Sequence, residues 1–249
     1  DVRRMLMTMR AYNEGGRAFS TYVASFLDAA KFSDDADQKE YASNMVQLLT
    51  PVAKAYLTDR SLECCIAGQQ VFGGHGYIRE WGQEQLVRDT RITQIYEGTN
   101  GIQSLDLMGR KIVGNNGKLF EQFASEVAEF IEAEADNAEL ADFVRPLSAA
   151  IERLSDVTEN VINSYKDDRN AIGAASVEYL ELFGLTAYAF MWAKMAKVAA
   201  PKVSEDVFYQ SKIKTAKFFY SRLLPKSVSL AELVKSGSED MMSLEADQF

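Results

Sequence analysis

Apolar residues recur along almost the whole chain at helical spacing, and this periodicity constrains the fold more than any other feature. The clearest run is Leu140, Leu147, Leu154 and Val161, which recur every seven residues. Such spacing places the four side chains on one face of a helix and predicts a helix-packing seam. Residues 1–31 keep to steps of three, four or seven in the same way. No convincing pair of strands interrupts the pattern, so the sequence predicts an all-α fold.

Glycine, proline and polar connectors divide this pattern into separate helices. We expect helices over residues 1–31, 36–49, 51–73, 83–90, 100–114, 118–135, 138–165, 174–199 and 204–224. Thr50 and Pro51 are typical of the N-cap and first position of a new helix. Long amphipathic stretches with few glycines follow Lys118, which predicts two helical bundles, residues 1–116 and 117–249. The acidic tail "SEDMMSLEADQF" is expected to be only partly ordered.

The charge balance excludes several classes of protein. A net charge of −9 and an isoelectric point near 4.8 argue against a nucleic-acid binder, which needs a basic face. No apolar run approaches the length of a membrane span. The opening "DVRRMLMTMR" lacks the apolar core of a signal peptide. The chain starts at Asp1 within a helical pattern, so we expect it to be a piece of a longer product.

The few residues that commonly bind metals or form disulfides point to neither role. Cys64 and Cys65 are adjacent, and neighbouring cysteines rarely pair. We therefore expect two thiols in a helix and a reducing compartment, the cytoplasm. His75 is the only histidine, and no Cys-x-x-Cys pair is present, so no metal site is predicted.

The stretch "FGGHGYIREWG", residues 72–82, has the highest glycine density. Its four glycines cannot share one stable helix, so they predict a turn that backbone or a ligand can approach closely. The turn follows a helix and lacks the GxGxxG spacing, which argues against a Rossmann site. Two interpretations remain open: a simple helix–helix turn, or a turn whose backbone N–H groups bind a phosphate. His75 is interpreted as a turn residue or a supporting ligand contact, and Arg88 with Asp89 as part of a structural arginine–carboxylate pair.

Several ordered blocks between residues 60 and 112 together resemble the C-terminal signature of the acyl-CoA dehydrogenase family. In "AGQQVFGGHGYIREWGQEQLVRDTRITQIYEGTNGIQ", a glutamine precedes a Gly-Gly-x-Gly-aromatic turn, "RD" follows, and Tyr-Glu-Gly-Thr comes last. Residues 1–59 fit the preceding helices of the family less specifically. Residues 118–249 look like the helical extension of some members, including those that act on methylmercaptopropionyl-CoA.

The resemblance implies a catalytic role for Glu97, which on local rules is only a helix-start residue. In the family, this glutamate removes a proton alpha to the thioester carbonyl while FAD accepts a hydride from the beta carbon. Tyr96 and Gly98 would flank the acyl-CoA substrate. The base must be desolvated, and the enolate-like oxygen must be stabilised, because the alpha C–H is a very weak acid.

The resemblance also implies a cofactor site that is shared between subunits. Gln70 and Gly74 would lie against the FAD of a neighbouring subunit, and Thr99 would contact FAD phosphate or adenine. The family often has a glutamine or glutamate two residues after that threonine, whereas this chain has Gly101. That side-chain contact is therefore not expected here.

The N-terminal helical domain and the central β-domain of the family do not match any part of this chain, so we expect the chain alone to be inactive. The implied electron acceptor is an electron-transferring flavoprotein, and the shared site implies a homo-oligomer, at least a dimer. An acyl-CoA oxidase and a non-catalytic helical assembly module are the alternatives. For residues 118–249 we expect subunit packing, with membrane contact as the alternative.

Overall fold

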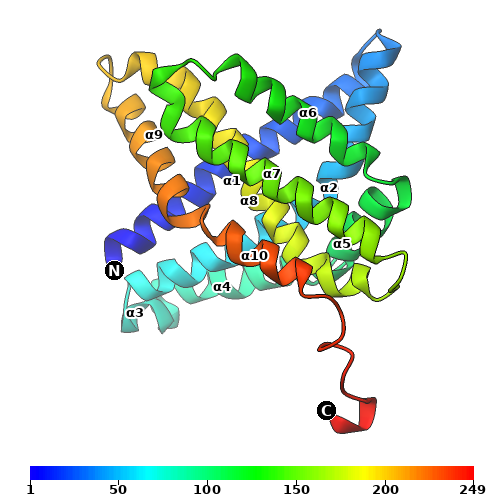
Figure 1. Ribbon diagram of the computed structural model, residues 1–249. Helices are drawn as coiled ribbons and strands as arrows, with labels where there is room; N and C mark the ends of the chain where they lie inside the picture. Colours follow the sequence, from blue (N-terminus) through cyan, green and yellow to red (C-terminus); the bar gives the residue numbers. More distant parts are fainter.

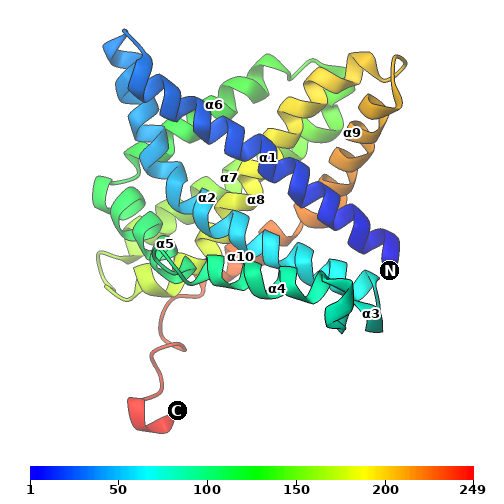
Figure 2. The ribbon, with the colours of Figure 1, turned by 180° about the vertical axis from the view of Figure 1, so that it is seen from behind.

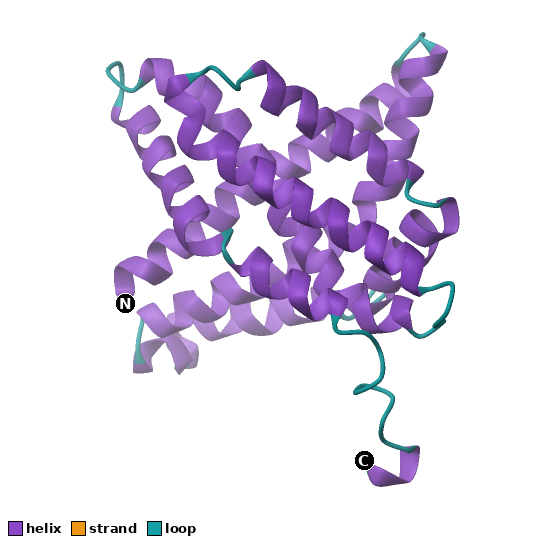
Figure 3. Ribbon diagram, in the orientation of Figure 1, coloured by secondary structure: helices purple, strands orange, loops and turns teal.

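The computed structural model describes residues 1–249 and contains helices but no strand, as the periodicity predicts (Figure 3). The α-helices are α1 (Val2–Phe32), α2 (Ala36–Val71), α3 (Gly74–Tyr77), α4 (Gln83–Arg91), α5 (Asn100–Leu105), α6 (Lys118–Ala133), α7 (Ala141–Ser164), α8 (Ala171–Ala199), α9 (Val207–Phe218) and α10 (Lys226–Lys235). Helices α5 and α9 continue into π-helical turns, Asp106–Ile112 and Phe219–Leu223. The 3₁₀ turns are Arg79–Trp81, Ile92–Gln94, Val113–Asn115, Ala138–Leu140, Ala200–Lys202 and Ala246–Gln248.

Helix α8 lies at the centre of the molecule. Helices α7 and α10 cover it on the side seen in Figure 1, and α1 and α2 cover the opposite side, seen in Figure 2. Every residue from Leu182 to Ala193 is buried. A helix that is apolar on all sides must be enclosed by other elements, and this explains why most of "AYAFMWAKM", residues 187–195, belongs to the core.

The predicted leucine seam forms the buried face of α7. Leu140, Leu147 and Leu154 are fully buried, and Val161 is 2% exposed. Thr158 on the same face shares a hydrogen bond with the hydroxyl of Tyr179 on α8, at 2.7 Å. Sequence periodicity therefore identified correctly the surface by which α7 packs on the central helix.

Glycines allow α1 and α2 to approach α8 closely. A Cβ atom at Gly15 of α1 would lie 2.8 Å from the ring of Tyr188, so α1 crosses α8 at a point where only glycine fits. On α8, a Cβ atom at Gly184 would lie 2.3 Å from the ring of Tyr56 on α2. Gly16 lies equally close to this helix, since a Cβ atom there would lie 2.8 Å from the hydroxyl oxygen of Tyr188.

The predicted helix break at Thr50 and Pro51 is wrong, because α2 runs without interruption from Ala36 to Val71. Thr50 Oγ1 donates to the carbonyl of Val46 at 2.6 Å instead of capping a new helix. The residues that flank the proline on the core side are fully buried: Leu48, Leu49, Val52 and Ala55. A proline inside a helix costs about 3 kcal/mol, but burying each such aliphatic side chain contributes about 1.5–3 kcal/mol. Packing therefore outweighs the local signal.

Helix α10 was not predicted, since the last expected helix ends at residue 224, immediately before Pro225. The proline instead occupies the N-cap of α10, and Leu230, Ala231 and Val234 of this helix are buried. Beyond Lys235 the chain leaves the body of the molecule (Figure 1). One core cluster includes residues from both predicted bundles, so the division near residues 114–118 stays a prediction.

Candidate functional site

The loop that carries Glu97 has an unusual backbone. It connects the 3₁₀ turn Ile92–Gln94 to α5, and the φ angles of Glu97 and Gly98 are +53° and +83°. A residue with a side chain pays about 1 kcal/mol or more for this left-handed conformation. Such a conformation persists only where the surrounding structure holds it in place.

The side chain of Asn100 holds the loop against α2. Its Oδ1 accepts a hydrogen bond from Lys54 Nζ at 2.8 Å, and its Nδ2 donates to Asp59 Oδ1 at 2.6 Å and to the Ala55 carbonyl at 3.2 Å. Gln94, on the other side of the loop, donates to the same Asp59 oxygen at 2.6 Å. Both ends of the loop are therefore fixed to one segment of α2. Local sequence rules missed this role, because the contacts join residues about 40 positions apart.

Glu97 itself has free hydrogen-bonding groups. Its carboxylate is exposed and has no hydrogen-bond or ion-pair partner in the chain, and its backbone N–H donates to no acceptor. Only its carbonyl is engaged, by Gln103 Nε2 at 3.4 Å. The N-cap of α5 is Thr99, whose Oγ1 accepts from the Ile102 N–H at 3.4 Å. The conformation of Glu97 is therefore not explained by helix capping.

The neighbours of Glu97 are also exposed. Tyr96 is half exposed, and Gly98 occupies a position where a Cβ atom would lie 2.8 Å from Gln103 Nε2. The positive φ of Gly98 favours glycine here, since residues with a side chain are strained in this conformation. A Cβ atom at Gly101, in the first turn of α5, would have only Thr99 Oγ1 near it, at 4.0 Å.

The glycine turn forms a second exposed cluster. Gln70 lies in the last turn of α2 and Gly74 begins α3, and both are exposed. No atom lies within 4 Å of a Cβ placed at Gly73 or Gly74, so the backbone is open to a ligand. Helices α3 and α5 lie at opposite ends of α4 (Figure 2). One chain therefore does not bring Gln70 and Gly74 together with Glu97.

Large apolar side chains are exposed along the face that joins these two clusters. They are at least 43% exposed and comprise Phe72, Tyr77, Ile78, Trp81, Leu86, Ile92, Ile95, Tyr96, Ile102 and Leu105. His75 packs edge-on against Trp81, with ring centroids 5.0 Å apart. Large apolar side chains that are exposed in such number on neighbouring segments are typical of a ligand or interaction site.

The predicted arginine–carboxylate pair exists, but its carboxylate is Glu84. Arg88 Nε lies 2.7 Å from Glu84 Oε2, four residues earlier on α4, and this hydrogen bond lowers the pKa of Glu84. Asp89 instead accepts from Gln85 Nε2 at 3.3 Å. The i, i+4 spacing on a helix brings side chains together, whereas adjacent residues point apart.

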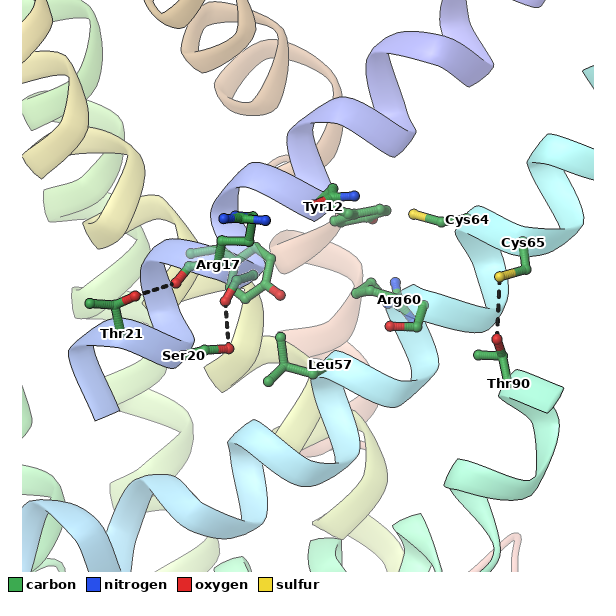
Figure 4. Close-up of a pocket in the computed structure, with 13 residues that line it drawn as sticks. Tyr12, Arg17, Ser20, Thr21, Leu57, Arg60, Cys64, Cys65 and Thr90 are labelled. Carbon is green, nitrogen blue, oxygen red and sulfur yellow. Dashed lines mark hydrogen bonds between the residues drawn. The ribbon is translucent and has the colours of Figure 1, made fainter. Parts of the chain in front are cut away.

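A cavity of about 740 Å³ lies between α1 and α2 (Figure 4). Two arginines line it, Arg17 and Arg60, and Arg60 is bonded to Glu63 at 3.1 Å and Glu181 at 3.3 Å. At its edge, Cys65 Sγ lies 3.3 Å from Thr90 Oγ1 on α4. None of the predicted site residues lines this cavity.

Both cysteines are free and partly buried. No group of three or more histidine, cysteine or acidic side chains is arranged to hold a metal ion. None of the helices combines the length and the apolar character needed to cross a membrane.

Comparison with known families and proteins agrees with the resemblance of the motif. Residues 1–112 match the family model "Acyl-CoA dehydrogenase, C-terminal domain", and residues 123–245 match "Acetyl-CoA dehydrogenase C-terminal like". The chain is 35% identical over 234 residues to 3-methylmercaptopropionyl-CoA dehydrogenase of Ruegeria pomeroyi, covering 90% of this chain and 39% of the relative. It is 31% identical over 268 residues to the broad-specificity linear acyl-CoA dehydrogenase FadE5 of Mycobacterium tuberculosis, covering 100% and 43%.

A solved structure shares the fold. The crystal structure of Caenorhabditis elegans ACDH-11 in complex with C11-CoA aligns with a TM-score of 0.75 at 21% identity, over 97% of this chain and 40% of that chain. The chain thus spans about two-fifths of the length of the relatives it matches. The two family models together account for nearly all of its residues. The chain belongs to the acyl-CoA dehydrogenase family and corresponds to the C-terminal helical part of its members.

Proposed function

We propose that the protein containing this chain is an FAD-dependent acyl-CoA dehydrogenase in which Glu97 is the catalytic base. The observation that carries the proposal is the state of Glu97 within a Tyr-Glu-Gly-Thr motif. Its backbone is strained, its carboxylate is unpaired, and its loop is fixed to α2 at both ends. Strained backbone of this kind clusters at functional sites.

The groups on Glu97 suit removal of an alpha proton from a thioester. The carboxylate accepts the proton, and the free backbone N–H is available to donate to the carbonyl oxygen as negative charge develops there. FAD, when bound, accepts the hydride that leaves the beta carbon. Substrate binding over the apolar face would exclude water from Glu97, with Tyr96 and Gly98 beside the acyl-CoA.

The open glycine turn fits a role in cofactor binding. Gln70 and Gly74 offer an amide side chain and an uncovered backbone, and Thr99 offers a hydroxyl at the start of α5. Because the turn and Glu97 lie at opposite ends of α4, the turn would serve the FAD of a neighbouring subunit. A site built this way needs at least a dimer.

The bare apolar face supports the proposal that this chain supplies only part of the site. We propose that segments outside this chain cover that face and complete the binding of FAD and substrate, so that residues 1–249 alone have no activity. Residues 1–116 would carry the site, and residues 117–249 would support assembly. Electrons would pass to an electron-transferring flavoprotein.

The test is an anaerobic titration of the intact protein with several acyl-CoAs, followed by flavin absorbance. Glu97→Gln should slow flavin reduction by about 10²–10⁴-fold, the usual contribution of a general base. Glu132→Gln, an exposed and unpaired glutamate on α6, is the matched control and should reduce flavin at the parent's rate. Flavin that binds but is bleached equally by parent and Glu97→Gln would exclude Glu97 as the base. Failure of the intact protein to bind FAD would favour a non-catalytic assembly module, and release of peroxide in air would favour an oxidase.

A further inference from the structure

The C-terminal tail, residues 238–249, has the composition of a docking segment. Its large apolar side chains are exposed by 50–91%, and they are Met241, Met242, Leu244 and Phe249. Its charged side chains are all acidic, and they are Glu239, Asp240, Glu245 and Asp247. The tail therefore combines apolar anchors with a single sign of charge.

Both ends of the tail have defined local structure. Ser238 Oγ donates to Asp168 Oδ2 in the loop before α8, which fixes the point where the tail leaves the body. The turn Ala246–Gln248 is closed by reciprocal hydrogen bonds between Glu245 and Gln248. The tail projects away from all helices of its own chain (Figures 1 and 2). Its apolar side chains thus lack a partner in the chain.

A complementary groove lies among α1, α8 and α9, near the C-terminal end of α8. Its volume is about 470 Å³, and most of its lining is apolar, including Tyr22, Met191, Met195, Val198 and Phe208. Methionine side chains adapt readily to apolar ligands of different shape.

The only charged side chains that line the groove are Lys194 and Lys212. Lys194 lies 3.5 Å from Glu126, and Lys212 lies 2.8 Å from Glu14. Each ammonium group has three donors, so each lysine can bond a further carboxylate. The groove thus offers apolar contacts together with two ammonium groups that have donors to spare.

We propose that the tail of one copy docks in this groove of a second copy. Met241, Met242 and Leu244 enter the groove, and the flanking acidic side chains pair with Lys194 and Lys212. In a two-fold dimer the exchange is reciprocal, since each copy offers one tail and one groove. This assembly role for residues 117–249 does not depend on the catalytic role of Glu97.

The reach of Met241, Met242 and Leu244 excludes their docking in the groove of their own chain. Ser238 is held next to the N-terminal end of α8, and Met195 in the groove lies about 36 Å along that helix from Ala171 at a rise of about 1.5 Å per residue. From Ser238 to Leu244, even a fully extended chain spans only about 22 Å. The anchors therefore cannot reach their own groove.

A competing site lies within reach of the same chain. A cavity of about 560 Å³ is lined by Arg3, Arg4, Arg222 and Lys226, and Lys226 begins the helix that leads into the tail. Its apolar lining is smaller than that of the groove. The two sites are separable, because one requires a contact between copies and the other a contact within a copy.

The experiment is disulfide trapping in the intact protein. Leu244→Cys and Val198→Cys are made separately, purified with different tags, mixed and oxidised, and covalent dimers are measured on denaturing gels. The matched control replaces Val198→Cys with Val177→Cys, since Val177 is 54% exposed on the opposite end of α8. Unsubstituted protein gives the background from Cys64 and Cys65.

We expect the 244–198 dimer to form at least about tenfold faster than the 244–177 dimer, because docking raises the local concentration of the thiols. Adding Lys194→Glu to the groove should reduce the rate. Equal rates with positions 198 and 177, or no dimer above background, would overturn the proposal. A second variant, Leu244→Cys with Arg222→Cys in the same chain, tests the competing site. If it forms an intrachain disulfide and no longer forms the 244–198 dimer with the Val198→Cys protein, the proposal is also overturned. Because both trapped positions are exposed, neither substitution disturbs the core.

Discussion

Replacing Asn100 with alanine should release the Glu97 loop from α2 without unfolding the molecule. The Asn100 side chain bonds Lys54, Asp59 and the Ala55 carbonyl. Two of these partners are charged, and each such hydrogen bond contributes about 1.5–3 kcal/mol, against about 1 kcal/mol for the neutral one. Asn100 is half-buried, so water replaces part of the loss. Loss of the Asn100 side chain should therefore destabilise the observed conformation of the Glu97 loop by about 2–4 kcal/mol.

That cost decides the conformation of Glu97. The left-handed backbone of Glu97 destabilises the observed loop conformation by about 1 kcal/mol. The hydrogen bonds of Asn100 stabilise this conformation by more than that. Without Asn100 the balance reverses, and Glu97 should leave its position for most of the time. Since every 1.4 kcal/mol changes a rate tenfold, a balance of about 1 kcal/mol against the observed loop should slow flavin reduction by acyl-CoA by about fivefold.

The assay is rapid-mixing flavin reduction, with a thermal melt of the same sample. Gln103→Ala is the matched control, because it removes only the 3.4 Å bond to the Glu97 carbonyl and should slow reduction by about threefold at most. An Asn100→Ala variant that reduces flavin at the parent's rate would refute the anchoring argument. A large fall in melting temperature would show that the side chain supports the fold and not just the loop.

Two further predictions concern the core of the molecule. Gly184→Ala would place a methyl group 2.3 Å from the buried ring of Tyr56 and should destabilise the protein by about 3 kcal/mol. Gly173→Ala, on the same helix, meets no atom within 4 Å and should stabilise the protein by about 0.5–1 kcal/mol. Chemical denaturation measures both free energies of unfolding, and the reverse order would contradict the packing argument. Burial raises the pKa of Cys64 to about 12. At pH 8 the fraction of Cys64 present as thiolate is therefore about a thousandfold smaller than for an ordinary cysteine, and it becomes large only as the pH approaches 12. Alkylation of Cys64, followed by mass spectrometry, should therefore be slower than in unfolded protein by a similar factor, and equal rates would contradict the burial argument.

Much of the fold could be predicted from periodicity, because long helices bury a repeating face. The leucine seam of α7 was predicted as a buried face, and most of α8 was predicted as a helix. The failures came where tertiary packing competes with a local signal. Pro51 looked like a helix start, but the buried residues around it keep α2 continuous. Pro225 looked like an end, although it caps the short helix α10.

The candidate site was predictable only as far as a contiguous motif allowed. Tyr96 to Thr99 could be found because the family motif is local. The anchor at Asn100 could not, since its partners are about 40 residues earlier and nothing in the local sequence marks them. For Arg88 the type of contact was predicted but Glu84 was not, because helix geometry selects the residue four positions away over the adjacent one.

The central position of α8 has a consequence for how such chains diverge. Residues before position 117 pack on α8 through glycine–aromatic contacts, Gly15 with Tyr188 and Tyr56 with Gly184. In each pair one partner belongs to the first half of the chain and the other to the second half. A recombinant that joined the halves of two distant relatives would inherit mismatched partners. Changes at these positions should therefore be accepted in pairs during evolution, so that both halves descend together.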